Sequence, residues 1–346
     1  MELDARKMRI LQAIIDDYIM TATPVGSRTI AKRADIGFSP ATIRNEMADL
    51  EEMGYLDQPH TSAGRVPSDK AYRLYVNSIM QRAKLSEAEV RYIRDHYSRR
   101  LDEVDEVVKQ TAWVLSSMTK YTSMVLAPQL HAIKLKYIHL VPVAEDKALV
   151  IIVTDAGMTR DSIIRIPPGM APDALERLGR TLTARFANCR LDEITLAQFN
   201  ELSGEVAQQR AFFDEMLRSV RRSMAKGGRS VELSGATNIL NYPEYSDMDR
   251  ARALLTAIEE KDLLYRVLTE ATNVEFSVRI GSENEDESIQ DCSVVTATYK
   301  IGSNPIGSFG VIGPTRMDYA RVLAMLGLIG RSLSDVLTNM FEEERK

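Results

Sequence analysis

Apolar side chains recur at helical spacing through the first part of the chain. One stripe covers about residues 4–21 and a second covers about residues 39–53, and each predicts an amphipathic helix. Between them, Ser27 is placed to cap a short helix that ends near residue 34. Ser39 and Pro40 form a strong helix start, because serine caps a helix and proline suits its first position.

Two short strand patterns follow the glycine at position 54. Residues 55–58 and 65–66 predict strands on either side of a loop, and a further helix begins after Ser68. Three helices followed by a β-hairpin are typical of a winged helix-turn-helix, in which one helix enters the major groove of DNA. We therefore assign residues 1–84 to a winged-helix DNA-binding domain.

Helices and strands are mixed beyond residue 84. A charged helix is predicted over about 85–122, and a mostly helical stretch later separates two groups of strands. The remaining predicted elements are strands at 134–143, 148–154 and 158–166, helices at 172–187 and 195–226, a short strand at 230–233, a helix at 247–268, strands at 274–281, 291–300 and 306–312, and a helix at 316–341. This order predicts an α+β multidomain chain with one sheet divided between about 132–190 and 274–346 by an insertion.

The helix over residues 39–53 has the pattern of a DNA-recognition helix. Ile43, Met47 and Leu50 fall in one narrow arc and are predicted to pack inward. The opposite face offers small and hydrogen-bonding side chains, which let a helix approach base edges closely. The residues predicted to contact bases are Ser39, Ala41, Thr42, Arg44 and Asn45. Arginine can pair with guanine, and asparagine with adenine, through two hydrogen bonds.

Cations and hydroxyls on the neighbouring segments predict contacts with the DNA backbone. The second helix supplies Ser27, Arg28, Thr29, Lys32 and Arg33, and the hairpin supplies His60, Thr61, Ser62 and Arg65 as a wing. In the first helix, Arg6, Lys7 and Arg9 lie off the apolar stripe and are expected to face solvent.

The charge of the whole chain points away from nucleic acid. The formal net charge is -5 at pH 7 and the pI is about 5.6, whereas a basic excess is usual for a DNA-binding protein. Residues 1–84 carry 12 Lys and Arg against 11 Asp and Glu, a net of +1, which leaves -6 for the rest of the chain. The positions of a few cations, rather than their number, therefore carry the DNA-binding hypothesis.

Other chemistry finds little support in the sequence. The four histidines are scattered without the spacing of a zinc site, and no nucleophile with a nearby base stands out. We expect no catalytic residue, no metal and no cofactor, and a protein that is not an enzyme. Cys189 and Cys292 predict two free thiols in a reducing compartment. No apolar run reaches the ~20 residues of a membrane span, so a cytoplasmic location is expected.

Four blocks of the sequence resemble the heat-inducible transcription repressor family HrcA. The longest is PVGSRTIAKRADIGFSPATIRNEMADLEEMGYLDQPHTSAGRVPSDKAYRLYV, from Pro24 to Val76. The others are SGATNILNYPEYSD at 234–247, DCSVVT at 291–296 and GVIGPTRMDYARV at 310–322. Their order and spacing span nearly the whole chain, although residues from about 85 to 228 carry no such block.

The resemblance implies more than the residues show by themselves. It implies a winged-helix domain, a GAF-like α/β domain, and a dimerising segment inserted into the latter. It also implies a homodimeric repressor that binds double-stranded DNA at an inverted-repeat operator ahead of chaperone operons. Activity would depend on the GroE chaperonin, and titration of that chaperonin by unfolded proteins after heat shock would relieve repression.

The expected domain boundaries combine the pattern with the resemblance. The five segments are a winged helix at 1–84, a helical linker at 85–130, the first part of the GAF-like domain at 131–195, the inserted dimerising domain at 196–270, and the second part of the GAF-like domain at 271–346.

Two alternatives stay open from the sequence. A GAF-like fold can hold a small ligand, so the same DNA-binding domain could belong to a metabolite sensor. Heat could lower the folded population directly, or chaperonin binding could hold the protein competent, since each changes the DNA-binding fraction by mass action.

Overall fold

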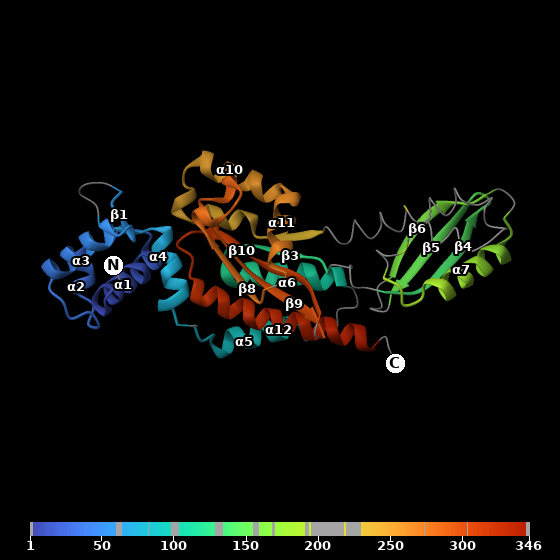
Figure 1. Ribbon diagram of the computed structural model, residues 1–346, viewed down its shortest axis with the longest axis horizontal. Helices are drawn as coiled ribbons and strands as arrows, with labels where there is room; N and C mark the ends of the chain where they lie inside the picture. The colour runs from blue at the N-terminus through green and yellow to red at the C-terminus, as the bar shows by residue number, and fades with distance from the viewer. Residues whose placement is uncertain are drawn as a thin grey trace. The chain divides into compact units, whose positions relative to one another are not determined.

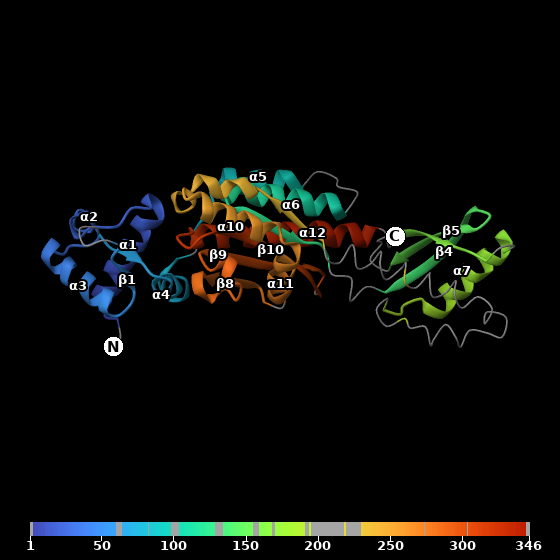
Figure 2. The same ribbon diagram turned by 90° about the horizontal axis from the view of Figure 1, so that it is seen from above.

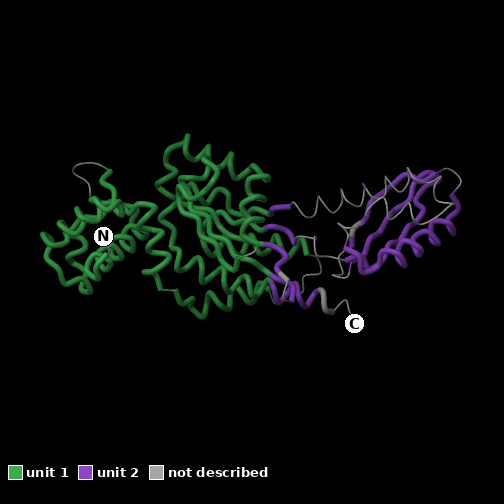
Figure 3. Tube along the Cα trace, viewed as in Figure 1, with its two compact units in different colours: residues 1–125, 232–299, 308–333 green, residues 126–231, 300–307, 334–346 purple. Residues whose placement is uncertain are grey.

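The computed structural model describes residues 3–59, 64–81, 83–97, 104–128, 134–154, 159–167, 170–190, 194, 218, 230–272, 274–302 and 304–343. The helix expected over 195–226 lies outside these residues, apart from Arg218. The chain divides into two compact units (Figure 3). The first unit is Met1–Val125, Glu232–Tyr299 and Ser308–Leu333, and the second is Leu126–Val231, Lys300–Gly307 and Ser334–Lys346.

The first unit begins with the predicted winged helix-turn-helix (Figure 1). Its elements are α1 (Ala5–Thr21), α2 (Ser27–Ala31), α3 (Pro40–Glu52), β1 (Leu56–Asp57), β2 (Val66–Pro67) and α4 (Asp69–Leu74). β1 and β2 pair antiparallel, and an isolated bridge joins Val25 to Arg65. The three-helix and hairpin order expected from the sequence is confirmed.

Local capping explains where these helices begin. The side chain of Ser39 accepts a hydrogen bond from the Thr42 amide at 3.1 Å, and Pro40 is the first residue of α3. α2 differs from the expectation, because Gly26 rather than Ser27 is its N-cap. The Gly26 carbonyl already accepts hydrogen bonds from the Thr29 and Ile30 amides, so the helix starts one residue earlier.

The predicted apolar stripes form the core of the winged helix. Ile14 and Ile15 of α1, and Ile43 and Leu50 of α3, are fully buried, and Met47 is 5% exposed. Burying one such side chain contributes roughly 1.5–3 kcal/mol of transfer free energy. The stripe on α3 therefore leaves only its opposite face free for a ligand.

The rest of the first unit is built on a five-stranded sheet with the order β7-β3-β10-β9-β8. The strands are β7 (Val231–Ser234), β3 (Thr122–Leu126), β10 (Asn304–Pro314), β9 (Cys292–Ile301) and β8 (Phe276–Ile280). The helical elements before and around it are the π-helical turn η1 (Tyr75–Ile79), α5 (Glu87–Tyr97), α6 (Val104–Thr119), α10 (Met248–Glu259), α11 (Lys261–Ala271) and α12 (Tyr319–Glu343). Short 3₁₀ turns are η4 (Ala236–Asn241), η5 (Pro243–Tyr245), η6 (Gly281–Glu283) and η7 (Glu287–Ile289).

Helices cover both faces of this sheet. The Ser308 side chain of β10 donates to the Leu268 carbonyl of α11, whereas the next residue, Phe309, packs at Gly330 of α12. Successive residues of a strand point to opposite faces, so α11 and α12 lie on different sides. α12 runs alongside the sheet in both views (Figures 1 and 2).

The division of the sheet differs from the expected one. β4 (Leu135–Ala144), β5 (Lys147–Thr154) and β6 (Thr159–Arg165) form a separate antiparallel sheet with the order β4-β5-β6. On the side away from β9, β10 pairs with β3. The hydrophobic pattern had predicted a helix up to about residue 122 and no strand between that helix and residue 134. All five residues of β3 are buried, so the strand lacks the alternation by which a half-exposed strand is recognised.

The second unit contains the three-stranded sheet and α7 (Pro172–Phe186). One face of the sheet packs on α7 through a cluster that includes Ile138, Val150, Ile164 and Leu182. Residues 232–270, which were expected in the inserted segment, fall in the first unit with the five-stranded sheet. Among the described helices, none has the length and hydropathy to cross a bilayer.

Candidate nucleic-acid interface

The outward face of α3 carries the side chains predicted to read bases. Ala41, Arg44 and Asn45 are exposed, and Thr42 is half-buried. Within the described part of the chain, the Arg44 and Asn45 side chains make no hydrogen bond or ion pair. Both groups are therefore free to donate to base edges, which is the arrangement that a recognition helix needs.

The hydroxyls at the start of α3 have a structural task. Ser39 Oγ accepts from the Thr42 amide and lies 2.9 Å from Thr42 Oγ1. These two side chains close the first turn of the helix, whereas Ser39 itself stays exposed. A DNA contact through either hydroxyl would share the group with the helix cap.

The acidic residues on the back of α3 are neutralised by α1. Glu46 is 8% exposed, and its carboxylate pairs with Arg6 at 3.3 Å and with Lys7 at 2.7 Å. Lys7 also pairs with Asp49 at 2.9 Å. Hydrogen bonds with these two carboxylates raise the pKa of Lys7 above its usual range. Arg6 and Arg9 are exposed as expected. The expectation was wrong for Lys7, whose side chain is only 14% exposed because both of its partners lie on another helix.

Arg65 lies at the base of the wing and is already paired. Its guanidinium donates to Glu51 Oε2 at 2.7 Å, and its backbone exchanges two hydrogen bonds with Val25. The preceding residue, Gly64, leaves no room for a side chain, because a Cβ there would lie 2.4 Å from the Val25 carbonyl oxygen. His60, Thr61 and Ser62, which were predicted to form the wing tip with Arg65, lie outside the described residues.

The predicted phosphate contacts on α2 separate into two groups. Arg28, Thr29 and Lys32 are exposed. Ser27 is half-buried as the first residue of the helix. Arg33 is occupied, because it donates to the Ala13 carbonyl at 3.2 Å and pairs with Asp35 at 3.3 Å.

Pairing explains how a domain with a net charge near zero can face a polyanion. Glu46, Asp49 and Glu51 of α3 are each bound to a cation of the same domain. In contrast, Arg28 and Arg44 form no ion pair within the described residues, and both are exposed. α2 and the outward face of α3 therefore each carry unneutralised positive charge, which is what contacts with DNA backbone and bases require.

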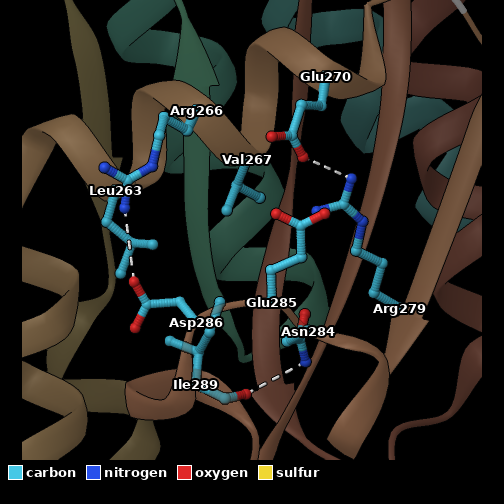
Figure 4. A pocket seen from close by; sticks show the side chains of 9 residues that line it. All are labelled: Leu263, Arg266, Val267, Glu270, Arg279, Asn284, Glu285, Asp286 and Ile289. Carbon is cyan, nitrogen blue, oxygen red and sulfur yellow. Dashed lines mark hydrogen bonds and ion pairs between the residues drawn. The ribbon is translucent and has the colours of Figure 1, made fainter.

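A separate cavity of about 280 Å³ lies beside α11 and the turns after β8 (Figure 4). Its rim carries Arg279, paired with Glu270 at 2.7 Å, and Arg266, 3.5 Å from Asp286. Asn284 donates to the Ile289 carbonyl, and its buried side-chain oxygen has no partner within the described residues. No group of three or more potential metal ligands occurs in the described part of the chain.

Known proteins are similar to this chain over its whole length. Residues 2–80 match the family described as "Winged helix-turn-helix transcription repressor, HrcA DNA-binding", and residues 105–323 match "HrcA protein C terminal domain". The chain is 41% identical over 341 residues to the "Heat-inducible transcription repressor HrcA" of Brevibacillus brevis, covering 99% of this chain and 100% of that one. It is 43% identical over 346 residues to the protein of the same name from Ruminiclostridium cellulolyticum, covering 99% of each.

A solved structure shares the fold. The crystal structure of a hypothetical protein at 2.2 Å resolution matches with a TM-score of 0.65 and 25% sequence identity, covering 98% of this chain and 100% of that chain.

Proposed function

The chain belongs to the HrcA family of heat-inducible transcription repressors, and we propose that it represses transcription by placing α3 in the major groove of an inverted-repeat operator. The observation that supports this most is the outward face of α3. Arg44 and Asn45 are exposed there and have no partner among the residues that the structure describes, and they lie beside a buried apolar stripe and away from the paired carboxylates. We further propose that the protein acts in the cytoplasm, where its operator would lie.

Substitution of the two base-reading candidates tests the proposal. Arg44→Ala and Asn45→Ala should each weaken operator binding by about 1–3 kcal/mol, because each removes one bidentate contact. The probe is the duplex that the wild-type protein selects from a random-sequence pool, compared with a scrambled duplex at two salt concentrations. Wild-type affinity in both variants would show that α3 does not read bases.

Two arginines nearby serve as a matched pair for the backbone contacts. Arg28→Ala should reduce the slope of log affinity against log salt by about 1, because an unpaired surface cation is removed. Arg65→Ala should leave that slope nearly unchanged and lower the thermal stability, because Arg65 is engaged with Glu51. Equal salt slopes for the two variants would contradict this division.

We propose that the protein is a homodimer joined through the three-stranded sheet of the second unit. An inverted repeat presents two half-sites related by a twofold axis, which a twofold dimer matches. The sheet face away from α7 carries Val141, Leu149 and Ile163 in direct register across all three strands. Val141 is 42% exposed and Ile163 is 64% exposed, and a second copy would cover such an apolar row.

Negative charge introduced on this apolar face of the sheet should separate the two subunits. Val141→Glu with Ile163→Glu should give monomers by light scattering and weaken operator binding, while the circular dichroism spectrum stays that of the wild type. Glu176→Lys on the exposed side of α7 is the control and should leave the dimer intact. A dimer that survives the double substitution would place the interface elsewhere.

We also propose, from the resemblance to HrcA, that the GroE chaperonin keeps the repressor competent. The test measures operator binding after the protein has been heated and cooled, with and without the chaperonin. Recovery only in its presence supports the dependence, whereas full spontaneous recovery would leave heat acting on the protein alone.

The cavity beside α11 favours one second candidate, a small-molecule sensor. Its rim is charged and its floor includes Leu263 and Val267, so a ligand would need both polar and apolar parts. Native mass spectrometry of the purified protein tests this. A stoichiometric small molecule supports the sensor, and its absence with full operator binding supports the repressor without a ligand.

A further inference from the structure

Arg316 connects the winged helix to the five-stranded-sheet domain within the first unit. It lies in the short link between β10 and α12, and its side chain is 11% exposed. Its Nη1 donates to the Ile19 carbonyl of α1 at 2.9 Å. Its Nε and Nη2 donate to the two carboxylate oxygens of Glu244, and the guanidinium lies 5.6 Å from the centre of the Tyr242 ring.

The partner in α1 is a group that needs a donor. Ile19 lies in the last turn of α1, where the final four carbonyls of a helix have no partner within it. This end of a helix also carries partial negative charge, which favours a cation. The planar guanidinium uses three separate nitrogens for the carbonyl and the two carboxylate oxygens, whereas a lysine has its donors on a single nitrogen and would not reproduce this geometry.

A second arginine makes a similar connection from α4. Arg73 donates to the Val278 carbonyl of β8 at 2.6 Å and to Glu283 Oε1 at 2.7 Å. One turn earlier, Asp69 accepts from the amide and hydroxyl of Ser282 at 3.0 and 3.2 Å.

The turn that receives α4 admits only glycine at one position. Gly281 has φ +53°, and a Cβ there would lie 2.0 Å from a carboxylate oxygen of Asp69. The close approach of α4 to this turn therefore depends on the missing side chain, in addition to the backbone conformation.

Aromatic packing fills the space near the two connections. Tyr72 of α4 and Tyr319 of α12 have ring centres 5.9 Å apart, and both side chains are buried. The Tyr319 hydroxyl lies 2.6 Å from Ser293 Oγ of β9. The winged helix is thus held through polar contacts at two places and by buried rings, rather than by a free linker.

We propose that Arg316 and Arg73 are positioning residues that fix the orientation of the winged helix and thereby set which half-site spacing the repressor accepts. This rests on the proposed function, in which two copies read an inverted repeat. One added base pair moves the second half-site by about 3.4 Å and rotates it by roughly 35°, since a turn of DNA holds 10–10.5 base pairs. A rigidly held reader cannot follow that change, and a released reader can.

A spacing series tests the proposal on the full-length protein. The probes are the inverted repeat selected by the wild type and the same repeat with one or two base pairs added to or removed from its centre. Wild type should bind the altered spacings at least tenfold more weakly. For Arg316→Ala combined with Arg73→Ala, that ratio should fall below about threefold, while affinity for a duplex with a single half-site stays unchanged.

Arg321 supplies a matched control on the first turn of α12. It pairs with Glu89 of α5 at 2.7 Å and makes no contact with the winged helix among those described, so Arg321→Ala should keep the wild-type spacing profile. Glu244→Gln with Glu283→Gln weakens both connections more gently and should relax the profile in the same direction if the double arginine variant fails to fold. Unchanged spacing selectivity in the folded variants would overturn the proposal.

A distance measurement separates this proposal from the proposed function. Spin labels at Asp57→Cys and Glu259→Cys, both exposed positions, would be placed in a Cys189→Ser background, where Cys292 stays buried. Wild-type connections should give one narrow distance distribution, and Arg316→Ala with Arg73→Ala should broaden it. A broad distribution with the arginines present refutes the fixed orientation. A narrow distance distribution in a protein that does not bind the inverted repeat refutes the proposed function, and with it the role of Arg316 and Arg73 in setting the half-site spacing.

Discussion

Gly64 is the position where a single methyl group should do the most local damage to the DNA-binding domain. A Cβ added there would lie 2.4 Å from the Val25 carbonyl oxygen and 2.5 Å from its carbon. Both atoms belong to the backbone, so no side chain can rotate away. The φ of Gly64 lies outside the left-handed region, and the clash itself is therefore the cause of the expected effect.

The cost of Gly64→Ala follows from what must move. Relief of the clash separates Val25 from Arg65, whose amides and carbonyls exchange hydrogen bonds of 2.8 and 2.9 Å. Two such bonds contribute about 0.5–1.5 kcal/mol each, and residual overpacking would add to this. We expect a loss of about 2–4 kcal/mol, confined at first to the base of the wing.

Amide hydrogen exchange is the direct assay, because the Val25 and Arg65 amides are the donors of these two bonds. Both should exchange at least tenfold faster in Gly64→Ala, and operator affinity should fall with them. Gly26→Ala is the matched control, because a Cβ there meets only Thr29 Oγ1 at 3.9 Å. Protection of both amides equal to that of the wild type would refute the reasoning.

Two further predictions concern titratable groups. Burial raises the pKa of the Cys292 thiol to about 11, so its alkylation near neutral pH should be slow until the first unit opens on heating. The half-buried Cys189 should be alkylated at a lower temperature. Simultaneous alkylation of both thiols at low temperature would contradict this. Burial also raises the pKa of Asp16 in the folded protein, despite the hydrogen bond from Tyr75. The stability that its carboxyl contributes is therefore fully present below the pKa of Asp16 in the unfolded chain, and it is lost as the pH rises through the pKa in the folded protein. Asp16→Asn should therefore raise the melting temperature relative to wild type at pH 7 and show no such gain below about pH 4; a gain that is independent of pH would disprove the assignment.

Much of the winged helix could be predicted from local pattern. Ile43, Met47 and Leu50 recur at helical spacing. Ser39 and Pro40, as the N-cap and the first residue, mark where the helix starts. Such signals act between near neighbours, so they survive without knowledge of the fold. The exposure of Arg44 and Asn45 followed directly from them.

The pairing of the five-stranded sheet could not be predicted in the same way. β3 and β10 lie far apart in sequence, and their register depends on which apolar face each one buries. β3 is buried on both faces, so its sequence carries no alternation to reveal the strand. The sheet was therefore divided at the wrong place, and three strands of the second unit were assigned to it.

By itself, the sequence determined the elements whose signals are local: the reading helix, its cap, its free side chains and the family to which the chain belongs. Tertiary structure decided the role of every charge whose partner is distant. Lys7 pairs with Glu46, Arg65 with Glu51, and Arg316 with Glu244 and the end of α1. The physical reason is that an ion pair depends on distance in space, while a helix depends on spacing along the chain, and only folding converts one into the other.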